Sequence, residues 1–422
     1  MPILPLVTSL LLGCPPPQEP QDSDSPAADS PGEPDLSFLE GMDCEALVDD
    51  PTTDPATGDC VEAEAVTGGT ALAINAVCTD AAITGLGSKR HLVVIPDDVQ
   101  TDLLWLHLGG SGGRPLNSKK LGLAALSEGY RYVSLAYPNE PSIANRCTCE
   151  GLGPRPLTCE EWARFEVLTG QDASPWLEME TDEGIEYRLK ALLLTLHDRQ
   201  PAGGWDAYLD SEGEIVWEKV ALSGFSQGGG MAGLIAREHR VDRVLYLSKG
   251  GGSSLQAMVD PSTYVACSAD MPCDDGATCC PFDDLACDTP PDEGGLCAIQ
   301  TPNPWVFAGP DTDGDFMGDG DASLRATPSD RQFAAIHADE GAWDYSPEVF
   351  SAWGMGDRSD YVDVGADQGP YPSTTQLFTL DLPPGGNCSE HQSMSADACL
   401  SVHPDTGLPA LLPVWLHVMT QP

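Results

Sequence analysis

Short, nearly continuous apolar runs alternate with longer mixed segments from about residue 90 to the end of the chain. Apolar runs of this length are typical of strands in a parallel sheet that is buried on both faces. The predicted strands are residues 91–95, 103–108, 132–137, 219–223, 243–248, 305–308 and 375–380, and the predicted helices are residues 118–128, 184–198, 227–237 and 411–419. The alternation predicts an α/β fold, with a mostly parallel sheet and helices on both faces.

The segment before this pattern is organised differently. Residues 1–14 form an apolar run ending in Leu-Leu-Gly-Cys, which resembles a bacterial lipobox, so we expect Cys14 to be lipidated after a signal peptide is removed. No Lys or Arg precedes the run, although signal peptides normally begin with basic residues. Residues 15–35, rich in Pro, Ser, Asp and Glu, predict a disordered tether. We expect residues 36–89 to form an irregular section that disulfides hold together. The α/β domain is expected to follow at residues 90–422.

The charge balance restricts the partners. The chain has 66 acidic and 20 basic residues and a net charge of -46, which repels nucleic acid and anionic lipid. We therefore expect no nucleic-acid partner and contact with a membrane only through the N-terminal lipid. No other segment has the roughly 18 consecutive apolar residues of a membrane span. The predicted location is the bacterial cell envelope, as an exported, lipid-anchored protein, with free secretion as the alternative.

Cysteine usage indicates an oxidising compartment. The chain has 15 cysteines, and lipidation of Cys14 would leave an even number for disulfides. Six of them lie in residues 267–297 with the spacing C-x5-C-x5-C-C-x6-C-x9-C, which resembles knottin-like minidomains. We expect an insertion in the α/β domain, either a substrate-gating lid or a stapled surface loop. The sequence does not fix its connectivity, and the lack of histidine beside these cysteines argues against zinc.

Residues 219–230 read KVALSGFSQGGG, in which a predicted strand leads into Gly224-Phe225-Ser226-Gln227-Gly228 and then into a small-residue helix. This is the G-x-S-x-G pattern of a nucleophile elbow, although a simple glycine-rich turn gives the same pattern. The glycines are needed because the serine occupies a strained turn that leaves no room for bulk. The following helix directs its N–H groups and its positive dipole end at the reacting oxygen. We predict Ser226 as the nucleophile.

A glycine-rich loop follows the predicted strand at residues 103–108. It reads His107-Leu108-Gly109-Gly110-Ser111-Gly112-Gly113 and resembles the HGGG-type loop of lipases and esterases. Such a loop supplies one backbone N–H of an oxyanion hole, here that of Gly110 or Ser111, between which the sequence does not choose. The second N–H would be that of Gln227, directly after the nucleophile.

The general base must lie downstream if the order is Ser, acid, His. Candidates are His337, His391, His403 and His417. His391 follows the last predicted strand across a Pro-Gly loop and is our choice, with His403 as the alternative and His417 expected to be structural. Cys388 and Cys399 flank His391 and would close a bridge that fixes its loop.

The acid is expected just after the predicted strand at residues 305–308, as Asp311, with Asp313 as the alternative. The same acidic stretch, residues 311–319, resembles a thrombospondin type 3 calcium repeat. We therefore also expect a calcium site at Asp313, Asp315 and Asp319. The simpler alternative is an acidic loop that is exposed to solvent and binds no ion. The stretch is not an EF-hand, because Phe316 stands where glycine is needed.

Together, these motifs resemble the α/β-hydrolase superfamily from about residue 90 onward, in particular exported bacterial members with a G-x-S-Q-G-G-G elbow. The resemblance implies a Ser-His-Asp triad, an acyl-enzyme intermediate and a small or polymeric carboxylic ester as substrate, with no cofactor required. A serine peptidase or amidase would use the same machinery. The alternative from another class is a non-catalytic binding lipoprotein of the envelope that keeps a hydrolase fold.

Overall fold

The structure is a computed structural model of the 422-residue chain. It describes residues 60–83, 89–143, 159–174, 177, 179–248, 304–314 and 318–422, together with four short strands between residues 256 and 301. Cys14, the predicted tether, Asp315 and most of the cysteine-rich insertion lie outside the described residues. Within the described part of the chain, no helix has both the length and the apolar character needed to cross a membrane.

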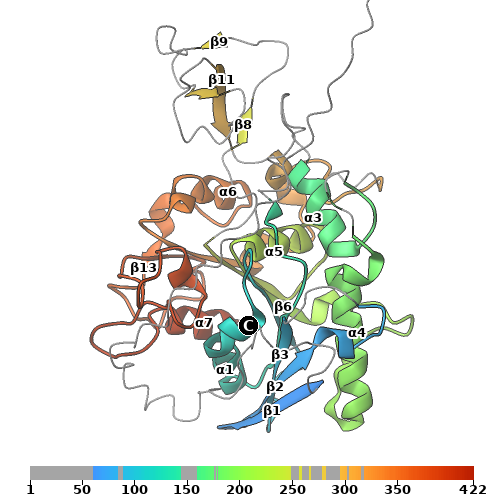
Figure 1. Ribbon diagram of the computed structural model, residues 1–422. Coiled ribbons are helices and arrows are strands. Elements are labelled where there is room, and N and C mark those ends of the chain that lie inside the picture. The colour runs from blue at the N-terminus through green and yellow to red at the C-terminus, as the bar shows by residue number, and fades with distance from the viewer. Residues whose placement is uncertain are drawn as a thin grey trace, which may run out of the picture.

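A ten-stranded sheet runs through the molecule in the order β1-β2-β3-β5-β4-β6-β7-β12-β14-β13 (Figure 1). Its strands are β1 Val61–Val66, β2 Gly69–Asn75, β3 Arg90–Pro96, β4 Leu104–Leu108, β5 Arg131–Leu135, β6 Val220–Phe225, β7 Arg243–Leu247, β12 Gln332–His337, β13 Val362–Asp363 and β14 Leu377–Leu380. β3 pairs antiparallel with both β2 and β5, and from β5 to β13 every pairing is parallel. The strand order from β2 to β14, with β3 reversed, is that of the α/β-hydrolase fold, so the predicted fold class is confirmed.

Helices cover both faces of this sheet (Figure 1). They are α1 Lys119–Ser127, α3 Cys159–Thr169, α4 Ile185–Arg199, α5 Gln227–Glu238, α6 Ser346–Ala352 and α7 Leu412–Met419. One core lies between the sheet and α3, α4 and α5, and the other lies between the sheet and α1 and α7. In β4, Leu104 and Leu106 enter the first core while Trp105 enters the second, because successive strand residues face opposite sides. The fully apolar strands are therefore explained by burial on both faces.

The predicted domain boundary at residue 90 falls inside this sheet and needs correction. β1 and β2, both before residue 90, extend the sheet, because β2 pairs with β3 and β1 pairs with β2. The sequence of β1, VEAEAV, alternates apolar and acidic residues, as an edge strand does when only one face is covered. A disulfide between Cys60 and Cys78 ties this part of the chain together, as the sequence predicts for this section.

One predicted strand is wrong, and four strands of the main sheet, β1, β2, β12 and β13, were not predicted. Residues 305–308 do not form a strand; Pro304–Phe307 is a 3-10 turn in which Trp305 and Val306 are buried. The apolar run there reflects burial, and the ring of Trp305 faces the guanidinium groups of Arg164 and Arg237 at 5.4 and 5.9 Å. The strand after β7 in the sheet is β12, which the sequence analysis did not predict.

The predicted insertion contains a small sheet of its own, which Figure 1 shows apart from the main sheet. It consists of β8 Gln256–Met258, β9 Ala266–Cys267, β10 Thr278–Pro281 and β11 Gly295–Thr301, with β11 pairing antiparallel with the other three. The insertion thus leaves the main sheet after β7 and returns before β12. The side chains of the insertion lie outside what the structure describes, so its disulfides and its role as a lid stay predictions.

Candidate active site

Ser226 lies at the turn between β6 and α5, with φ 53° and ψ -117°. This positive φ is unfavourable for a residue with a side chain. Gly224 and Gly228 are both required, because a Cβ at Gly224 would overlap the Gly228 carbonyl and a Cβ at Gly228 would overlap that of Leu108. The Ser226 N–H donates to the Leu247 carbonyl at 3.0 Å, which fixes the turn to the end of β7. This geometry is that of a nucleophile elbow.

The glycine-rich loop after β4 lies directly against this elbow. A Cβ placed on Gly110 would come within 3.0 Å of the Ser226 Cβ, so the backbone of the loop passes beside the nucleophile. The Ser111 hydroxyl donates to the Gln227 side-chain oxygen at 3.0 Å. The three residues predicted for the oxyanion hole, Gly110, Ser111 and Gln227, are therefore brought together around Ser226.

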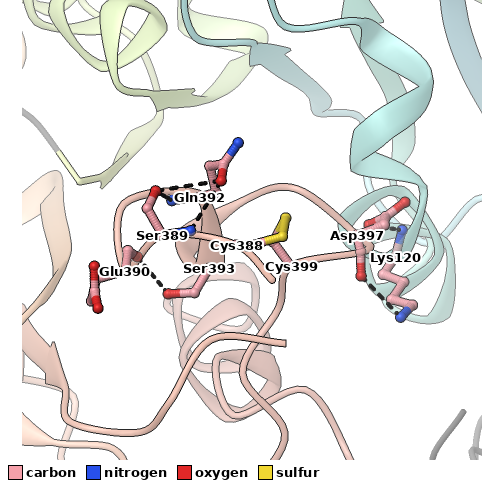
Figure 2. Close-up of a disulfide and its surroundings, with 8 residues drawn as sticks. All are labelled: Lys120, Cys388, Ser389, Glu390, Gln392, Ser393, Asp397 and Cys399. Atoms are coloured by element: carbon pink, nitrogen blue, oxygen red, sulfur yellow. Dashed lines mark hydrogen bonds between the residues drawn. A yellow bond between two sulfur atoms is a disulfide. The ribbon is translucent and has the colours of Figure 1, made fainter. Parts of the chain in front are cut away.

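His391 lies between Cys388 and Cys399 in the sequence, and a disulfide joins these two cysteines. Figure 2 shows the loop that this disulfide closes. The bridge confirms the pairing expected from the sequence. The Asp397 carboxylate in the same loop accepts the backbone N–H groups of Lys119 and Lys120, at 2.7 and 3.1 Å, at the start of α1. A carboxylate is favourable at a helix N-terminus, so the loop is held to the body of the protein as well as to itself.

The imidazole of His391 lies beside the elbow and against a buried carboxylate. Its ring packs on that of Phe225, the residue before Ser226, with 4.9 Å between ring centroids. Its Nδ1 is 2.6 Å from Oε2 of Glu340. The Glu340 side chain is 3% exposed, while that of His391 is 37% exposed. Because an ionised carboxylate only accepts hydrogen bonds, Nδ1 carries the proton and Nε2 is left as the basic nitrogen.

Glu340 reaches this position because it follows β12. It lies three residues beyond the strand end, and its Oε1 accepts the backbone N–H of His337 at 3.2 Å. β12 pairs with β7, and β7 pairs with β6, so the carboxyl ends of these parallel strands meet at one edge of the sheet. The signal in the sequence was the apolar run at residues 333–336, which is followed by His337 and by a turn that carries Asp339 and Glu340.

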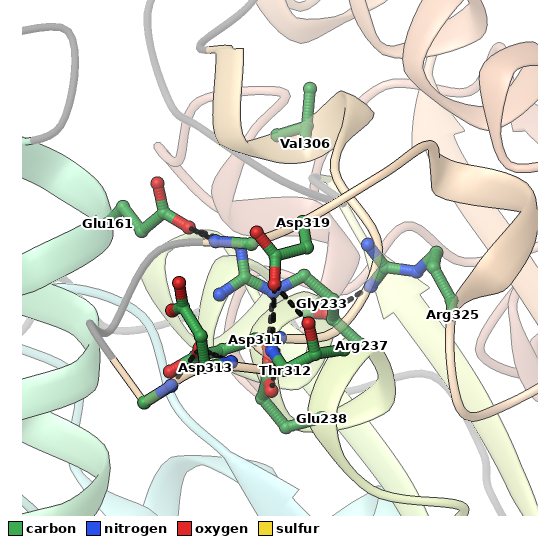
Figure 3. Close-up of polar contacts among 12 residues, drawn as sticks. Glu161, Gly233, Arg237, Glu238, Val306, Asp311, Thr312, Asp313, Asp319 and Arg325 are labelled. Carbon is green, nitrogen blue, oxygen red and sulfur yellow. Dashed lines mark hydrogen bonds and ion pairs between the residues drawn. The ribbon is translucent and has the colours of Figure 1, made fainter.

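The predicted acid, Asp311 or Asp313, lies away from His391, and the carboxylate that contacts His391 is that of Glu340. The Asp311 N–H donates to the carboxylate of Glu238, the last residue of α5, at 3.0 Å. Ser226 precedes the other end of this 12-residue helix, which spans about 18 Å. The Asp311 carboxylate instead accepts the backbone N–H groups of Asp313 and Gly314. Figure 3 shows both aspartates in their own loop near Arg237.

The other candidate histidines are held by the backbone. His337 Nε2 lies 2.9 Å from the Leu382 carbonyl, and its Nδ1 accepts the N–H of Asp339. His403 Nδ1 accepts the N–H of Asp405 at 3.3 Å. His417 Nε2 lies 3.0 Å from a carbonyl in the loop before β14, and burial lowers the pKa of this imidazole. These contacts are structural, which leaves His391 as the histidine at the elbow.

The acidic loop brings three carboxylates close together. One carboxylate oxygen from each of Asp311, Asp313 and Asp319 lies within 4.8 Å of the others. Hydrogen bonds from Thr312 to the Asp319 carboxylate lower the pKa of Asp319 and hold it ionised. Of the expected ligands, Asp315 lies outside the described residues. Calcium binding at Asp313, Asp315 and Asp319 stays a prediction.

Chelation tests this prediction. An ion bound by the native fold alone stabilises it by mass action, by about 2.7 kcal/mol at a hundredfold excess over Kd. We therefore expect excess EDTA to lower the melting temperature of the wild type and calcium to restore it. The matched control is the double variant Asp313→Asn, Asp319→Asn, whose melting temperature should not respond to either reagent. If EDTA leaves the melting temperature of the wild type unchanged, the prediction that this loop binds calcium is wrong.

Comparison with known proteins adds little to this picture. No protein-family model matches the chain, and no curated protein matches it. Among solved structures, an esterase from Pseudomonas putida is 11% identical over 93% of this chain and 98% of its own, with a TM-score of 0.33. A Thermus thermophilus protein, TT1662, is 13% identical over 85% and 98%, with a TM-score of 0.33. An α/β hydrolase from a deep-sea metagenome library is 20% identical over 37% and 50%, with a TM-score of 0.19. At TM-scores this low, the fold assignment rests on the strand order and the elbow of this chain.

Proposed function

We propose that this protein is a serine hydrolase that cleaves carboxylic esters through Ser226, His391 and Glu340. The observation that carries the proposal is the 2.6 Å contact between His391 Nδ1 and the buried Glu340 carboxylate, beside a serine on a strained elbow. A nucleophile needs an adjacent base, and that base needs a third group to orient it. The closeness of Gly110, Ser111 and Gln227 to Ser226 supports an oxyanion hole made by their backbone N–H groups.

In the proposed reaction, His391 Nε2 accepts the Ser226 hydroxyl proton as the serine oxygen attacks the ester carbonyl. The negative charge that develops on the carbonyl oxygen is stabilised by the backbone N–H of Gln227 and one from the Gly110–Ser111 segment. His391 then returns the proton to the departing alcohol, which leaves an acyl group on Ser226. Water, activated by the same imidazole, releases the acid and restores the enzyme. Glu340 stabilises the imidazolium that forms in each half-reaction.

A peptidase or amidase would use the same residues, because the imidazole can protonate an amine leaving group equally well. The ester preference is part of the proposal, and a panel of p-nitrophenyl esters and matched anilides decides it. Lipidation of Cys14, export and the absence of a nucleic-acid partner stay predictions from the sequence.

Labelling with a fluorophosphonate tests the class of enzyme independently of the substrate. The reagent phosphonylates a serine that is activated by a base and an oxyanion hole. We expect wild-type protein to be labelled once, on the peptide that contains Ser226, and Ser226→Ala to remain unlabelled. Mass spectrometry of the labelled peptide separates Ser226 from Ser111 on the adjacent loop and from Ser248, whose hydroxyl lies 3.5 Å from the His391 carbonyl. Labelling that persists in Ser226→Ala, or a wild type that is never labelled, would refute the proposal.

A further inference from the structure

Three carbonyl groups of the loop at residues 109–113 are hydrogen-bonded by two side chains from the segment after β5. The Tyr137 hydroxyl donates to the Gly109 carbonyl at 2.6 Å. The Asn139 side-chain amide donates to the carbonyls of Gly110 and Gly113, at 2.6 and 2.9 Å. The Gly110 carbonyl also accepts the Gly113 N–H at 3.0 Å. The carbonyls of Gly109 and Gly110, which precede the two candidate oxyanion donors, are therefore both fixed.

Fixing a carbonyl also fixes the next amide N–H. In a trans peptide the C=O of one residue and the N–H of the following residue lie in one plane and point in opposite directions. The bond from Tyr137 to the Gly109 carbonyl therefore sets the direction of the Gly110 N–H. The bonds on the Gly110 carbonyl set the direction of the Ser111 N–H in the same way. Each N–H points away from the side chain that holds the carbonyl before it.

Asn139 is itself held in one orientation. It is 2% exposed, and its Oδ1 accepts a hydrogen bond from the Lys89 ammonium group at 2.7 Å. An ammonium only donates, so this contact identifies the oxygen of the amide and leaves its nitrogen facing the two carbonyls. The backbone carbonyl of Asn139 also accepts the Gly112 N–H at 3.1 Å. The loop and Asn139 thus hold each other at three points.

The residue that carries the second candidate donor, Gln227, is hydrogen-bonded to the loop that carries the first. The Gln227 side-chain oxygen accepts both the Ser111 hydroxyl and the Ile143 N–H, each at 3.0 Å. The Gln227 side chain therefore connects the elbow to the glycine-rich loop, and the two backbone donors keep a fixed separation. Oxyanion donors are effective when they are oriented before the reaction, because no reorganisation is then needed as the charge develops.

We infer that Asn139, assisted by Tyr137, is a positioning residue of the oxyanion hole. The inference rests on the proposed serine-hydrolase function and extends it to residues that do not contact the substrate. Asn139 orients the Ser111 N–H and Tyr137 orients the Gly110 N–H. Loss of either side-chain donor leaves the triad in place and loosens the N–H groups that bind the oxyanion.

Two variants test this role, with a matched control. Asn139→Asp keeps the size of the side chain and an oxygen for Lys89, and it removes the amide donor. Tyr137→Phe removes a single hydroxyl. The control, Tyr132→Phe, deletes the hydroxyl of a buried tyrosine in the same stretch of chain, where the partner is Ser118 and the residue packs in the other core. The readouts are kcat and KM for an ester, Ki for a trifluoromethyl ketone, fluorophosphonate labelling and melting temperature.

Because one oxyanion donor is worth about 10²–10³ in kcat, we expect a loosened donor to lower kcat by roughly 10–100-fold in Asn139→Asp and less in Tyr137→Phe. KM should change little, and Ki for the ketone, which binds as a tetrahedral oxyanion, should rise in parallel with the fall in kcat. Tyr132→Phe should match the wild type in all three constants. A purely structural role would lower melting temperature and active fraction without changing Ki.

The outcomes separate the two proposals. If wild-type protein is neither labelled nor active, the serine-hydrolase function fails and this inference fails with it. If the wild type is labelled and active but both variants keep its kcat and Ki, only the positioning role is overturned. If Asn139→Asp does not fold, Tyr137→Phe decides alone: a reduced kcat with a raised Ki supports the role, and wild-type constants overturn it.

Discussion

Replacing Ser226 with alanine is expected to lower kcat/KM for an ester by about 10⁴–10⁶, the range found when a triad nucleophile is removed. No acyl-enzyme can then form, and any residual rate comes from the oxyanion hole and from substrate binding alone. The measurement is initial-rate kinetics on the best ester of the panel. Among the described residues, no hydrogen bond that holds the fold together uses the Ser226 hydroxyl, so the variant should still fold. Its thermal unfolding should stay cooperative, with the melting curve of the wild type.

Ser226→Gly makes the same prediction sharper, because it separates catalysis from stability. Alanine keeps the Cβ that is strained at φ 53°, whereas glycine tolerates this conformation. The strain released is of the order of 1–3 kcal/mol, offset in part by the roughly 0.4–1 kcal/mol that glycine costs through the unfolded chain. We expect both variants to be inactive and the glycine variant to melt at a higher temperature than the alanine variant. An active variant, or a glycine variant that melts lower, would contradict the elbow.

Much of the site could be predicted because its chemistry depends on short, local patterns. The elbow requires two glycines around Ser226, and the structure shows that each lies against a backbone carbonyl. The loop at Gly110 and the histidine after the last strand follow from the order of elements along the chain. The bridge between Cys388 and Cys399 was predictable because the two cysteines flank His391 at a short separation.

The acid could not be placed reliably because its position depends on which apolar run forms the strand beside β7. Two apolar runs lie in this part of the chain, at residues 305–308 and 332–337, and only the first was predicted as a strand. Trp305 and Val306 of the first run and all of the second are buried. Only the second pairs with β7; the first packs its tryptophan against Arg164 and Arg237. Hydropathy indicates that a segment is buried, but not which strand it pairs with. The many aspartates after residue 308 then favoured an acid at Asp311 or Asp313. Asn139 was missed for a related reason, since a lone asparagine has no motif and its role depends on contacts across the fold.

The second large effect on activity is expected at Glu340, the carboxylate that contacts His391. Glu340→Gln is expected to lower kcat by about 10⁴ while leaving the fold intact, as a carboxylate-to-amide change does in a related triad. The physical reason lies in the second contact of Glu340, whose Oε1 accepts the fixed backbone N–H of His337. A glutamine keeps its oxygen toward that donor, so its NH₂ group faces His391 Nδ1. The imidazole must then accept at Nδ1 and carry its proton on Nε2, where it cannot take the proton of Ser226.

The matched controls are Asp311→Asn and Asp313→Asn, which make the same chemical change at the two aspartates that the sequence favoured. Asp311 is bonded at the C-terminal end of α5, about 18 Å along the helix from the elbow, so both variants should keep nearly the wild-type kcat. Fluorophosphonate labelling should slow sharply in Glu340→Gln and stay unchanged in the two controls, because labelling needs the same basic Nε2. If Asp311→Asn lost activity while Glu340→Gln kept the wild-type kcat, Asp311 would be the acid of the triad and Glu340 would not. The same kcat in all three variants would mean that His391 works without an orienting carboxylate.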